Sequence, residues 1–323
     1  LPALSPTSPG TNYWDSKPES KISREQLGRI VLQVHQILDI FKSLGVKLHN
    51  KNFLDIGTGN GMIPRLLLEL SNLSESVGTD PFLDGEHSTS WQKHNHDKTF
   101  ASINNFIKNS CKSNLEYRKY FELTYNENST FIPQNVKIAI PKAKKYRFER
   151  FGIHDIYKFN EKFDIIYCKA IEHISNWEGA FESISKISKK GTYFYIKHRS
   201  FFSYLGPHRY ASIAIPWGHL LLTDKEYKRF VEEFHYERKE KMCRFYFEDL
   251  TYPRNKVSDL LKIASNNGFY LEGIKIEPPN YRKKIFPKIK EIENFWKIIK
   301  NNFPDLSFEE MFSGIYHIVL KKD

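Results

Sequence analysis

The stretch Phe53-Leu54-Asp55-Ile56-Gly57-Thr58-Gly59-Asn60-Gly61-Met62 decides the fold, because it joins an apolar strand to a helix through a loop with few large side chains. The alternating glycines allow a sharp turn and a close approach of the backbone to a ligand. The helix that follows directs its free N–H groups to the same place. Pro64 fits in the first turn of that helix, where no N–H is needed. We therefore predict that a large cofactor lies on this loop, the alternative being a tight turn without a ligand.

The spacing of the glycines separates two classes of cofactor. A dinucleotide-binding loop reads G-x-G-x-x-G and would place its third glycine at Met62, whereas this chain reads D-x-G-x-G-x-G, with Asp55 two residues before Gly57. A second short strand is expected from Ser76 to Asp80. A doubly wound fold places there the carboxylate that accepts the ribose hydroxyls. We predict that role for Asp80; the alternative is a surface acid before a proline.

Apolar runs further along the chain continue the alternation of strands and helices. The expected third to seventh strands are Tyr146 to Phe151, Phe163 to Cys168, Thr192 to Ile196, Tyr270 to Ile276 and Gly314 to Leu320. The expected helices run from Ser23, which forms a capping box with Gln26, to Gly45; from Trp177 to a stop at Gly191; and from Lys256 to Asn267 before Gly268. The run from Phe163 to Cys168 is almost continuously apolar, as a strand that is buried on both faces requires.

The order of these motifs resembles the class I S-adenosylmethionine-dependent methyltransferases over roughly residues 53–80 and 146–321. The resemblance implies an α/β, Rossmann-like, doubly wound sheet of seven strands, in which the last two strands form an antiparallel hairpin. It implies S-adenosylmethionine as the cofactor. Lys169-Ala170-Ile171-Glu172-His173 looks like the family's segment that lines the cofactor pocket, and Asp155 stands where an acid contacts the adenine amine, the alternative being a solvated loop acid. The implied cofactor-binding residues are Asp55, Gly57, Thr58, Gly59, Gly61, Asp80, Pro81, His154, Asp155, Lys169, Ala170 and His173.

The expected domain organisation is one methyltransferase domain with additions. Residues 1–22 are rich in proline, serine and threonine and predict an extended arm, whose Tyr13-Trp14 pair is expected either to fold over the cofactor mouth or simply to pack. Residues 23–323 form the domain, with insertions at about 81–145, 198–250 and 278–312. Acids and histidines between Asp84 and Asp97 match no closed pattern of metal ligands, so no metal site is predicted.

The segment after the fifth expected strand is rich in histidines, basic residues and aromatic residues. It begins at the carboxyl end of a strand, where open α/β sheets bind their ligands. Methyl transfer to a hydroxyl requires loss of a proton, and histidine titrates near neutral pH. We predict His198, His208 and His219, in that order, as candidate catalytic bases. The string Pro216-Trp217-Gly218-His219-Leu220-Leu221 resembles bacterial small-molecule and glycan-associated methyltransferases; the alternative is that Trp217 and His219 only pack.

Composition limits the class of substrate. The 323 residues carry a formal charge of +11, which raises nucleic acid as a partner, but the lysines are spread widely and no Asn-Pro-Pro-Tyr motif follows the fourth strand. Three separated cysteines suggest no disulfide framework, and no apolar run reaches the length of a membrane span, so a cytoplasmic enzyme is expected. We predict O-methylation of a polar small molecule or sugar derivative. Methylation of RNA or protein, and S-adenosylmethionine binding without catalysis, stay as alternatives.

Overall fold

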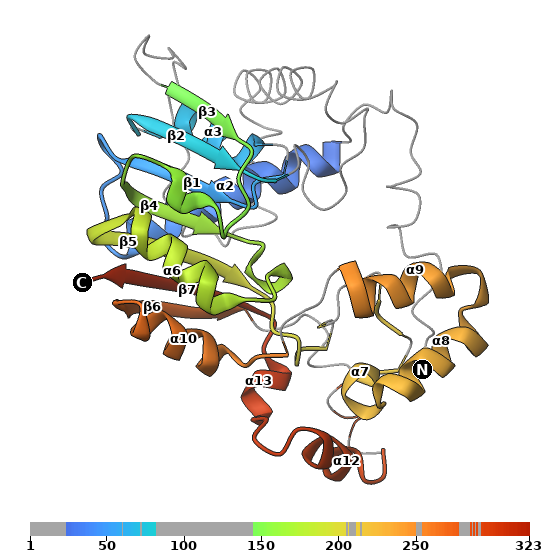
Figure 1. Ribbon diagram of the computed structural model, residues 1–323. Helices are drawn as coiled ribbons and strands as arrows, with labels where there is room; N and C mark the ends of the chain where they lie inside the picture. Colours follow the sequence, from blue (N-terminus) through green and yellow to red (C-terminus); the bar gives the residue numbers. More distant parts are fainter. Residues whose placement is uncertain are drawn as a thin grey trace. The chain divides into compact units, whose positions relative to one another are not determined.

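The computed structural model describes residues 24–59, 61–71, 73–81, 145–204, 206, 211–213, 215–249, 254–277, 285, 287, 289 and 292–323. These residues belong to two compact units, one within Lys17–Arg150 and the other within Phe151–Asp323. The described strands form a seven-stranded sheet in the order β3-β2-β1-β4-β5-β7-β6 (Figure 1). This order confirms the predicted Rossmann-like fold.

The strands begin and end close to where the sequence places them. They are β1 Asn52–Ile56, β2 Glu75–Thr79, β3 Lys145–Glu149, β4 Phe163–Cys168, β5 Ser188–His198, β6 Phe269–Glu277 and β7 Ile315–Lys322. The α-helices are α2 Arg24–Ser43, α3 Met62–Leu70, α6 Trp177–Ile187, α7 Gly218–Leu221, α8 Asp224–Phe234, α9 Lys239–Arg244, α10 Val257–Asn266, α12 Phe295–Asn302 and α13 Phe308–Phe312. Short 3-10 turns, η2 Ile156–Lys158 and η3 Ile171–His173, flank β4.

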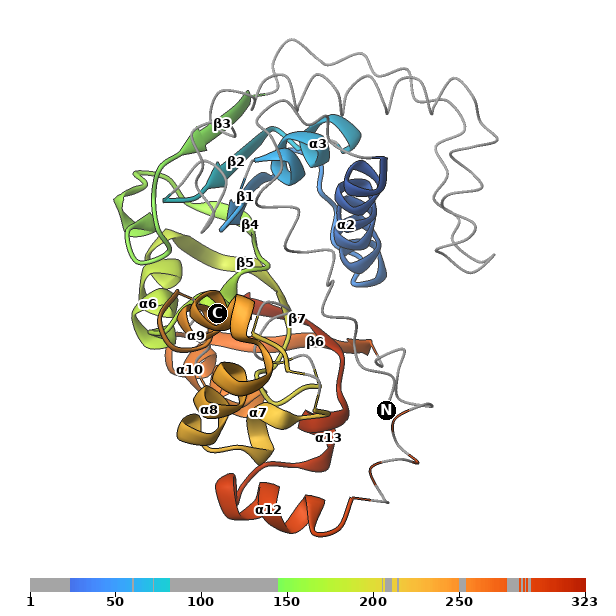
Figure 2. The same cartoon turned by 90° about the vertical axis from the view of Figure 1, so that its right-hand side faces the viewer.

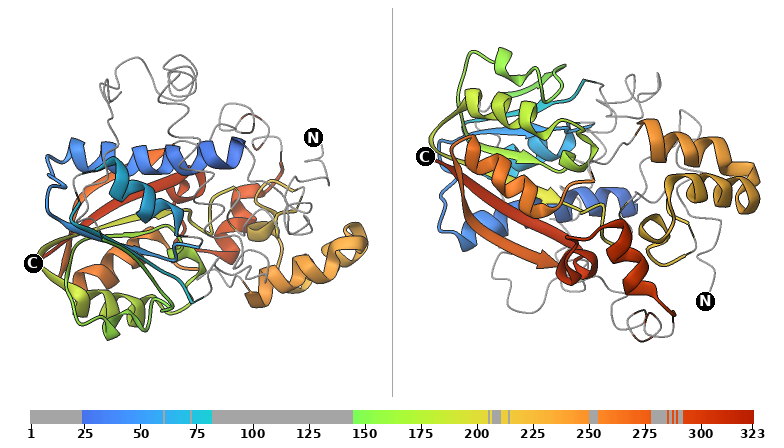
Figure 3. Two further views of the ribbon diagram at one scale, coloured as in Figure 1. Left: turned by 90° about the horizontal axis from the view of Figure 1, so that it is seen from above. Right: turned by 60° about the horizontal axis from the view of Figure 1, so that its bottom comes forward.

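The first unit contains a parallel three-stranded part of the sheet. β2 pairs with β1 on one side and with β3 on the other, and all three strands run in the same direction. Helix α3 covers β1 and β2, and α2 packs beside α3 (Figure 3). The apolar face of α2 is buried through Val34, Ile37 and Phe41. Because the strands are parallel, their carboxyl ends meet at one edge, and the glycine loop lies there.

The second unit contains the mixed part of the sheet. β4 and β5 are parallel, whereas β7 runs antiparallel to both β5 and β6, which confirms the terminal hairpin. Helices α6 and α10 lie on the same face of these strands (Figure 1). Between them, the ring of Phe181 packs against Phe194 and Phe269 at centroid distances of 5.6 and 6.2 Å. All three rings are buried and form the centre of this core.

A further apolar cluster of the second unit gathers around Trp217, which is fully buried. Its indole contacts Tyr204, Phe295 and Phe312 at centroid distances of 5.2, 5.9 and 4.7 Å. Helices α7, α8 and α9 lie together in this region (Figure 2). The described parts of the segments predicted as insertions 198–250 and 278–312 therefore share one core.

The structure corrects one predicted boundary. Gly191 does not end the helix: α6 stops at Ile187, and β5 begins at Ser188. The Ser188 hydroxyl donates to the carbonyl of Ile184, and the extended backbone of Ser188 ends the helix. Gly191, at φ 82°, instead lies in an irregular stretch where the β4–β5 register shifts. The 1–22 arm, Ser23, His208 and almost all of the 81–145 insertion lie outside the described residues.

We expect Phe181→Ala to lower the free energy of unfolding by about 3–5 kcal/mol, because it opens a cavity between α6, β5 and β6. Phe234→Ala is the matched control, since that ring is 67% exposed and its loss should change the stability by less than about 0.5 kcal/mol. Urea denaturation measures both variants. Equal effects would mean that the Phe181 core is wrongly placed.

Candidate active site

The glycine loop after β1 has a backbone that few other residues could adopt. Gly57, Gly59 and Gly61 have φ values of 70°, 62° and 71°, all in the left-handed region. The N–H groups of Gly57 and Thr58 both donate to the carbonyl of Thr79, at 2.9 and 3.1 Å. The loop is therefore fastened to the end of β2, and Gly61 leads directly into α3.

The side chain of Asp55 stabilises this loop through a hydrogen bond. Its carboxylate accepts the Thr58 hydroxyl at 2.6 Å, and both side chains are buried. Space around Thr58 is tight, because a Cβ on Gly78 would lie 3.0 Å from Thr58 Cγ2 and 3.1 Å from Pro64 Cγ. Asp55, which was predicted as a cofactor-binding residue, thus holds the shape of the loop.

Asp80 brings a second carboxylate to the same loop. It follows β2, is 3% exposed, and its Oδ2 accepts the N–H of Gly59 at 2.9 Å. Its own N–H donates to the carbonyl of Glu149 at the end of β3. A buried carboxylate thus lies beside a loop of glycines with positive φ at the start of a helix. This arrangement fits an adenosyl group, because the carboxylate can accept the ribose hydroxyls and the glycines leave room for the ligand. Pro81, next in the chain, is exposed.

The other predicted cofactor-binding residues lie in the second unit, around β4. His154 is exposed, and Asp155 forms a half-exposed ion pair with Lys158 at 2.7 Å. Lys169 and Ala170 directly follow β4, and His173 closes the turn η3. Their positions at the carboxyl end of a parallel strand agree with the predicted role, which stays a prediction for each of them.

His198, the last residue of β5, is buried beside the carboxylate of Glu172. Its Nδ1 is 3.9 Å from Glu172 Oε2, and its ring packs edge-on against Trp177 at 5.7 Å. Both ring nitrogens of His198 and the Oε2 atom of Glu172 are buried without a hydrogen-bond partner among the described residues. Burial alone would raise the pKa of the Glu172 carboxyl, but His198 and His173 nearby hold it below its usual value.

Comparison with known proteins gives the family. The profile described as "Methyltransferase domain" matches residues 29–250, more than half of the chain. The chain belongs to this methyltransferase family. It is a class I S-adenosylmethionine-dependent methyltransferase, which confirms the class I resemblance, the enzyme class and the cofactor that the sequence predicts, whereas the bacterial small-molecule and glycan-associated type stays a prediction. No curated protein matches its sequence.

Several solved structures are similar to this methyltransferase. The cyclopropane synthase MmaA2 from Mycobacterium tuberculosis is 16% identical with a TM-score of 0.44, the match covering 89% of this chain and 84% of that one. A methyltransferase from Mesorhizobium loti is 11% identical with a TM-score of 0.43, at coverages of 88% and 96%. The YcgJ protein of Bacillus subtilis is 14% identical with a TM-score of 0.42, at 90% and 98%. These scores are low, so the family assignment rests on the domain match.

The remaining histidine candidates of the methyltransferase differ from His198. The ring of His219 is buried, and its Nε2 bonds to the carbonyl of Phe201 at 2.8 Å. Burial lowers the pKa of His219 to about 3, which makes it a weak base. A Cβ on Gly206 would collide with the same Phe201 carbonyl, so the packing here is close. This environment favours a packing role for His219, whereas His208 lies outside the described residues.

Sequence reasoning missed two residues at the end of the central strands. The sequence assigns Glu172 only to the segment after β4, and no pattern pairs it with a histidine 26 positions later. Lys197 precedes His198 on β5 and lies opposite His317 of β7. Burial, with the charges of Lys169 and Arg199, lowers the pKa of Lys197 to about 8. The only sequence signal for Lys197 was its place between the apolar run of the strand and His198.

Two features are absent from the described part of the chain. No group of three or more histidine, cysteine or acidic side chains there could hold a metal ion. None of the helices described is both long enough and apolar enough to cross a membrane.

We expect Asp80→Ala to weaken binding of S-adenosylhomocysteine by about tenfold to a thousandfold, because charge-assisted hydrogen bonds contribute roughly 1.5–3 kcal/mol each. Glu75→Ala is the control, since Glu75 begins the same strand and pairs with Arg147 at 2.7 Å, away from the loop. Titration calorimetry measures both. Unchanged affinity in Asp80→Ala would show that the ribose is held elsewhere.

Proposed function

We propose that this methyltransferase O-methylates a polar small molecule or a sugar derivative, with His198 as the general base. The observation that carries the proposal is the buried pair of His198 and Glu172 at the ends of β5 and β4, whose facing atoms lack hydrogen-bond partners among the described residues. Buried polar groups normally have partners, so such a pair marks a place where a ligand completes the bonding. Partners missing from an otherwise well-packed region favour an acceptor hydroxyl.

The cofactor supplies an activated methyl group on its sulfonium, and the chain aligns the acceptor for in-line displacement. In this proposal, Asp80 binds the ribose, and the backbone around Gly57 and Gly59 receives the rest of the ligand. The Thr58 hydroxyl donates its proton to Asp55, so in this proposal it meets the cofactor only as a hydrogen-bond acceptor. The loop thus arrives in its binding shape before the ligand does, which reduces the entropic cost of binding.

His198 has the chemistry that a hydroxyl acceptor requires. A neutral imidazole offers one N–H donor and one acceptor nitrogen. Nδ1 of His198 lies on the side of the Glu172 carboxylate. In this proposal, Nε2 is therefore the nitrogen that takes the proton from the hydroxyl of the substrate. The negative charge of Glu172 then stabilises the imidazolium that forms. Trp177 and Tyr316 contact the ring at centroid distances of 5.7 and 6.4 Å and keep it in place.

The substrate class is tested with isotope-labelled S-adenosylmethionine in an extract that contains metabolites, protein and RNA. We expect label in a low-molecular-weight product, with a methoxy group identified by mass spectrometry. Label confined to RNA or protein would replace the small-molecule assignment. An N-methyl product would leave the methyltransferase activity intact but remove the need for a histidine base.

For that product, we expect His198→Ala to lower turnover by roughly a hundredfold or more while cofactor affinity stays within about threefold. The reason is that a positioned base acts only on the acceptor. His49→Ala is the matched control, because it removes an exposed histidine far along the chain from β5. Near-normal turnover of His198→Ala at saturating acceptor would exclude the base role.

Glu172→Gln should reduce turnover less than His198→Ala and should shift the acidic limb of the kcat/KM profile to lower pH. The physical reason is that the amide no longer stabilises a protonated base with a negative charge. Rates measured from pH 5 to 9 test this positioning role. A uniform loss of activity at every pH, without movement of the limb, would indicate that Glu172 only supports the fold.

A further inference from the structure

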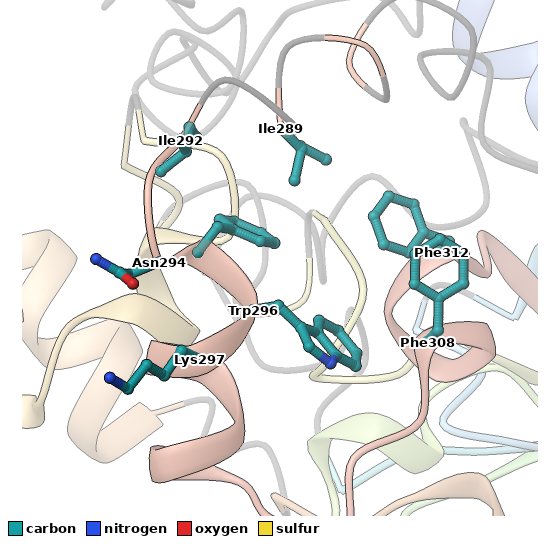
Figure 4. A pocket seen from close by; sticks show the side chains of 8 residues that line it. Ile289, Ile292, Asn294, Trp296, Lys297, Phe308 and Phe312 are labelled. Atoms are coloured by element: carbon teal, nitrogen blue, oxygen red, sulfur yellow. The ribbon is translucent and has the colours of Figure 1, made fainter.

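A pocket of about 470 Å³ lies between α12 and α13 of the second unit. Six of its eight lining side chains are apolar: Ile289, Ile292, Phe295, Trp296, Phe308 and Phe312. In Figure 4, Trp296 faces Phe308 and Phe312, while Asn294 and Lys297 lie at the opposite margin. Its volume falls within the range of about 300–1,000 Å³ that is typical of small-ligand sites.

Two buried aromatic rings form the floor of the pocket. Phe295 and Phe312, which are 4% and 5% exposed, both pack against the buried indole of Trp217. Helix α13 is held in place by Glu310, whose carboxylate accepts the Ser200 hydroxyl and the N–H of Val257. A floor of buried rings at this volume favours a single chain or ring over a whole helix, and the hydrogen bonds of Glu310 hold the α13 wall in place without a ligand.

The mouth of the pocket leaves large apolar surface uncovered. Trp296 is 38% exposed and Phe308 is 37% exposed, although their rings are neighbours at 6.0 Å and Phe308 stacks on Phe312 at 4.2 Å. Exposed aromatic side chains that converge on a concavity commonly mark binding sites. A ligand that fills the hollow would remove this surface from water.

The charge at the margin indicates which ligand fits. Lys297 forms no ion pair or hydrogen bond with any residue of the described chain, whereas Lys300 on the same helix donates to the carbonyls of Pro304 and Leu306. We propose that the pocket binds the apolar chain of a small anionic amphiphile, such as a medium-chain carboxylate, with its charged group at Lys297. This site differs from the pair of His198 and Glu172, and binding there is measurable without methyl transfer.

The probe is octanoate, below its micelle concentration, titrated by calorimetry into the full chain and compared with butanoate. Each buried CH₂ group is worth about 0.8 kcal/mol, so affinity should rise about fourfold per carbon and roughly two-hundredfold between the two acids. Octylammonium should bind more weakly than octanoate, and Lys297→Glu should reverse that preference. Equal affinity for the two acids would overturn the proposal.

Trp296→Ala should weaken octanoate binding by at least tenfold, while Ile298→Ala should leave it within twofold. Ile298 is a close control, because it lies on the same helix with the same exposure of 38% but does not line the pocket. Phe308→Ala serves as a second lining variant should Trp296→Ala fold poorly, as judged by thermal unfolding. Octanoate binding that survives both lining variants, or binding to lipid vesicles without binding to monomeric octanoate, would refute the assignment.

Discussion

The hydrogen bond from the N–H of Gly59 to the Asp80 carboxylate is the interaction on which the cofactor end of the structure depends. It joins the loop after β1 to the end of β2, and it can form only because Gly57, Gly59 and Gly61 turn through left-handed conformations. The Thr79 carbonyl and the bond between Asp55 and Thr58 hold the same loop from two further sides. One carboxylate thus shapes the loop and lies where a ribose would be recognised.

Side chains that alternate between the two faces of β5 separate two groups of polar residues at the carboxyl end of this strand. Successive residues of a strand point to opposite faces, so His198 packs with Trp177 beneath α6, while Lys197 lies in the row of His317 on the other face. On that face, the Tyr195 hydroxyl bonds to His317 Nδ1 at 2.6 Å, and His317 Nε2 lies 2.9 Å from Glu277. Strand parity therefore separates the pair of His198 and Glu172 from the polar groups around His317 on the other face.

Local patterns predicted much of the fold because the relevant forces act over short stretches of sequence. The apolar run from Phe163 to Cys168 predicted a strand, and the spacing from Asp55 predicted an acid at Asp80, which the structure places next to the glycine loop. Gly191 misled because a positive φ serves a bulge as well as a helix end, and sequence does not distinguish the two. Glu172, Lys197 and the pocket beside Trp296 required tertiary contacts that no local pattern reports.

The central claim is that the braced glycine loop and Asp80 select an adenosyl-sulfur cofactor over a dinucleotide. Chemical denaturation of the full chain, with each adenosyl ligand at 100 times its dissociation constant, tests it most directly. S-Adenosylmethionine and S-adenosylhomocysteine should each raise the free energy of unfolding by about 2.7 kcal/mol, whereas NAD at the same concentration should leave it unchanged. Stabilisation by NAD, with no response to either adenosyl ligand, would contradict the account.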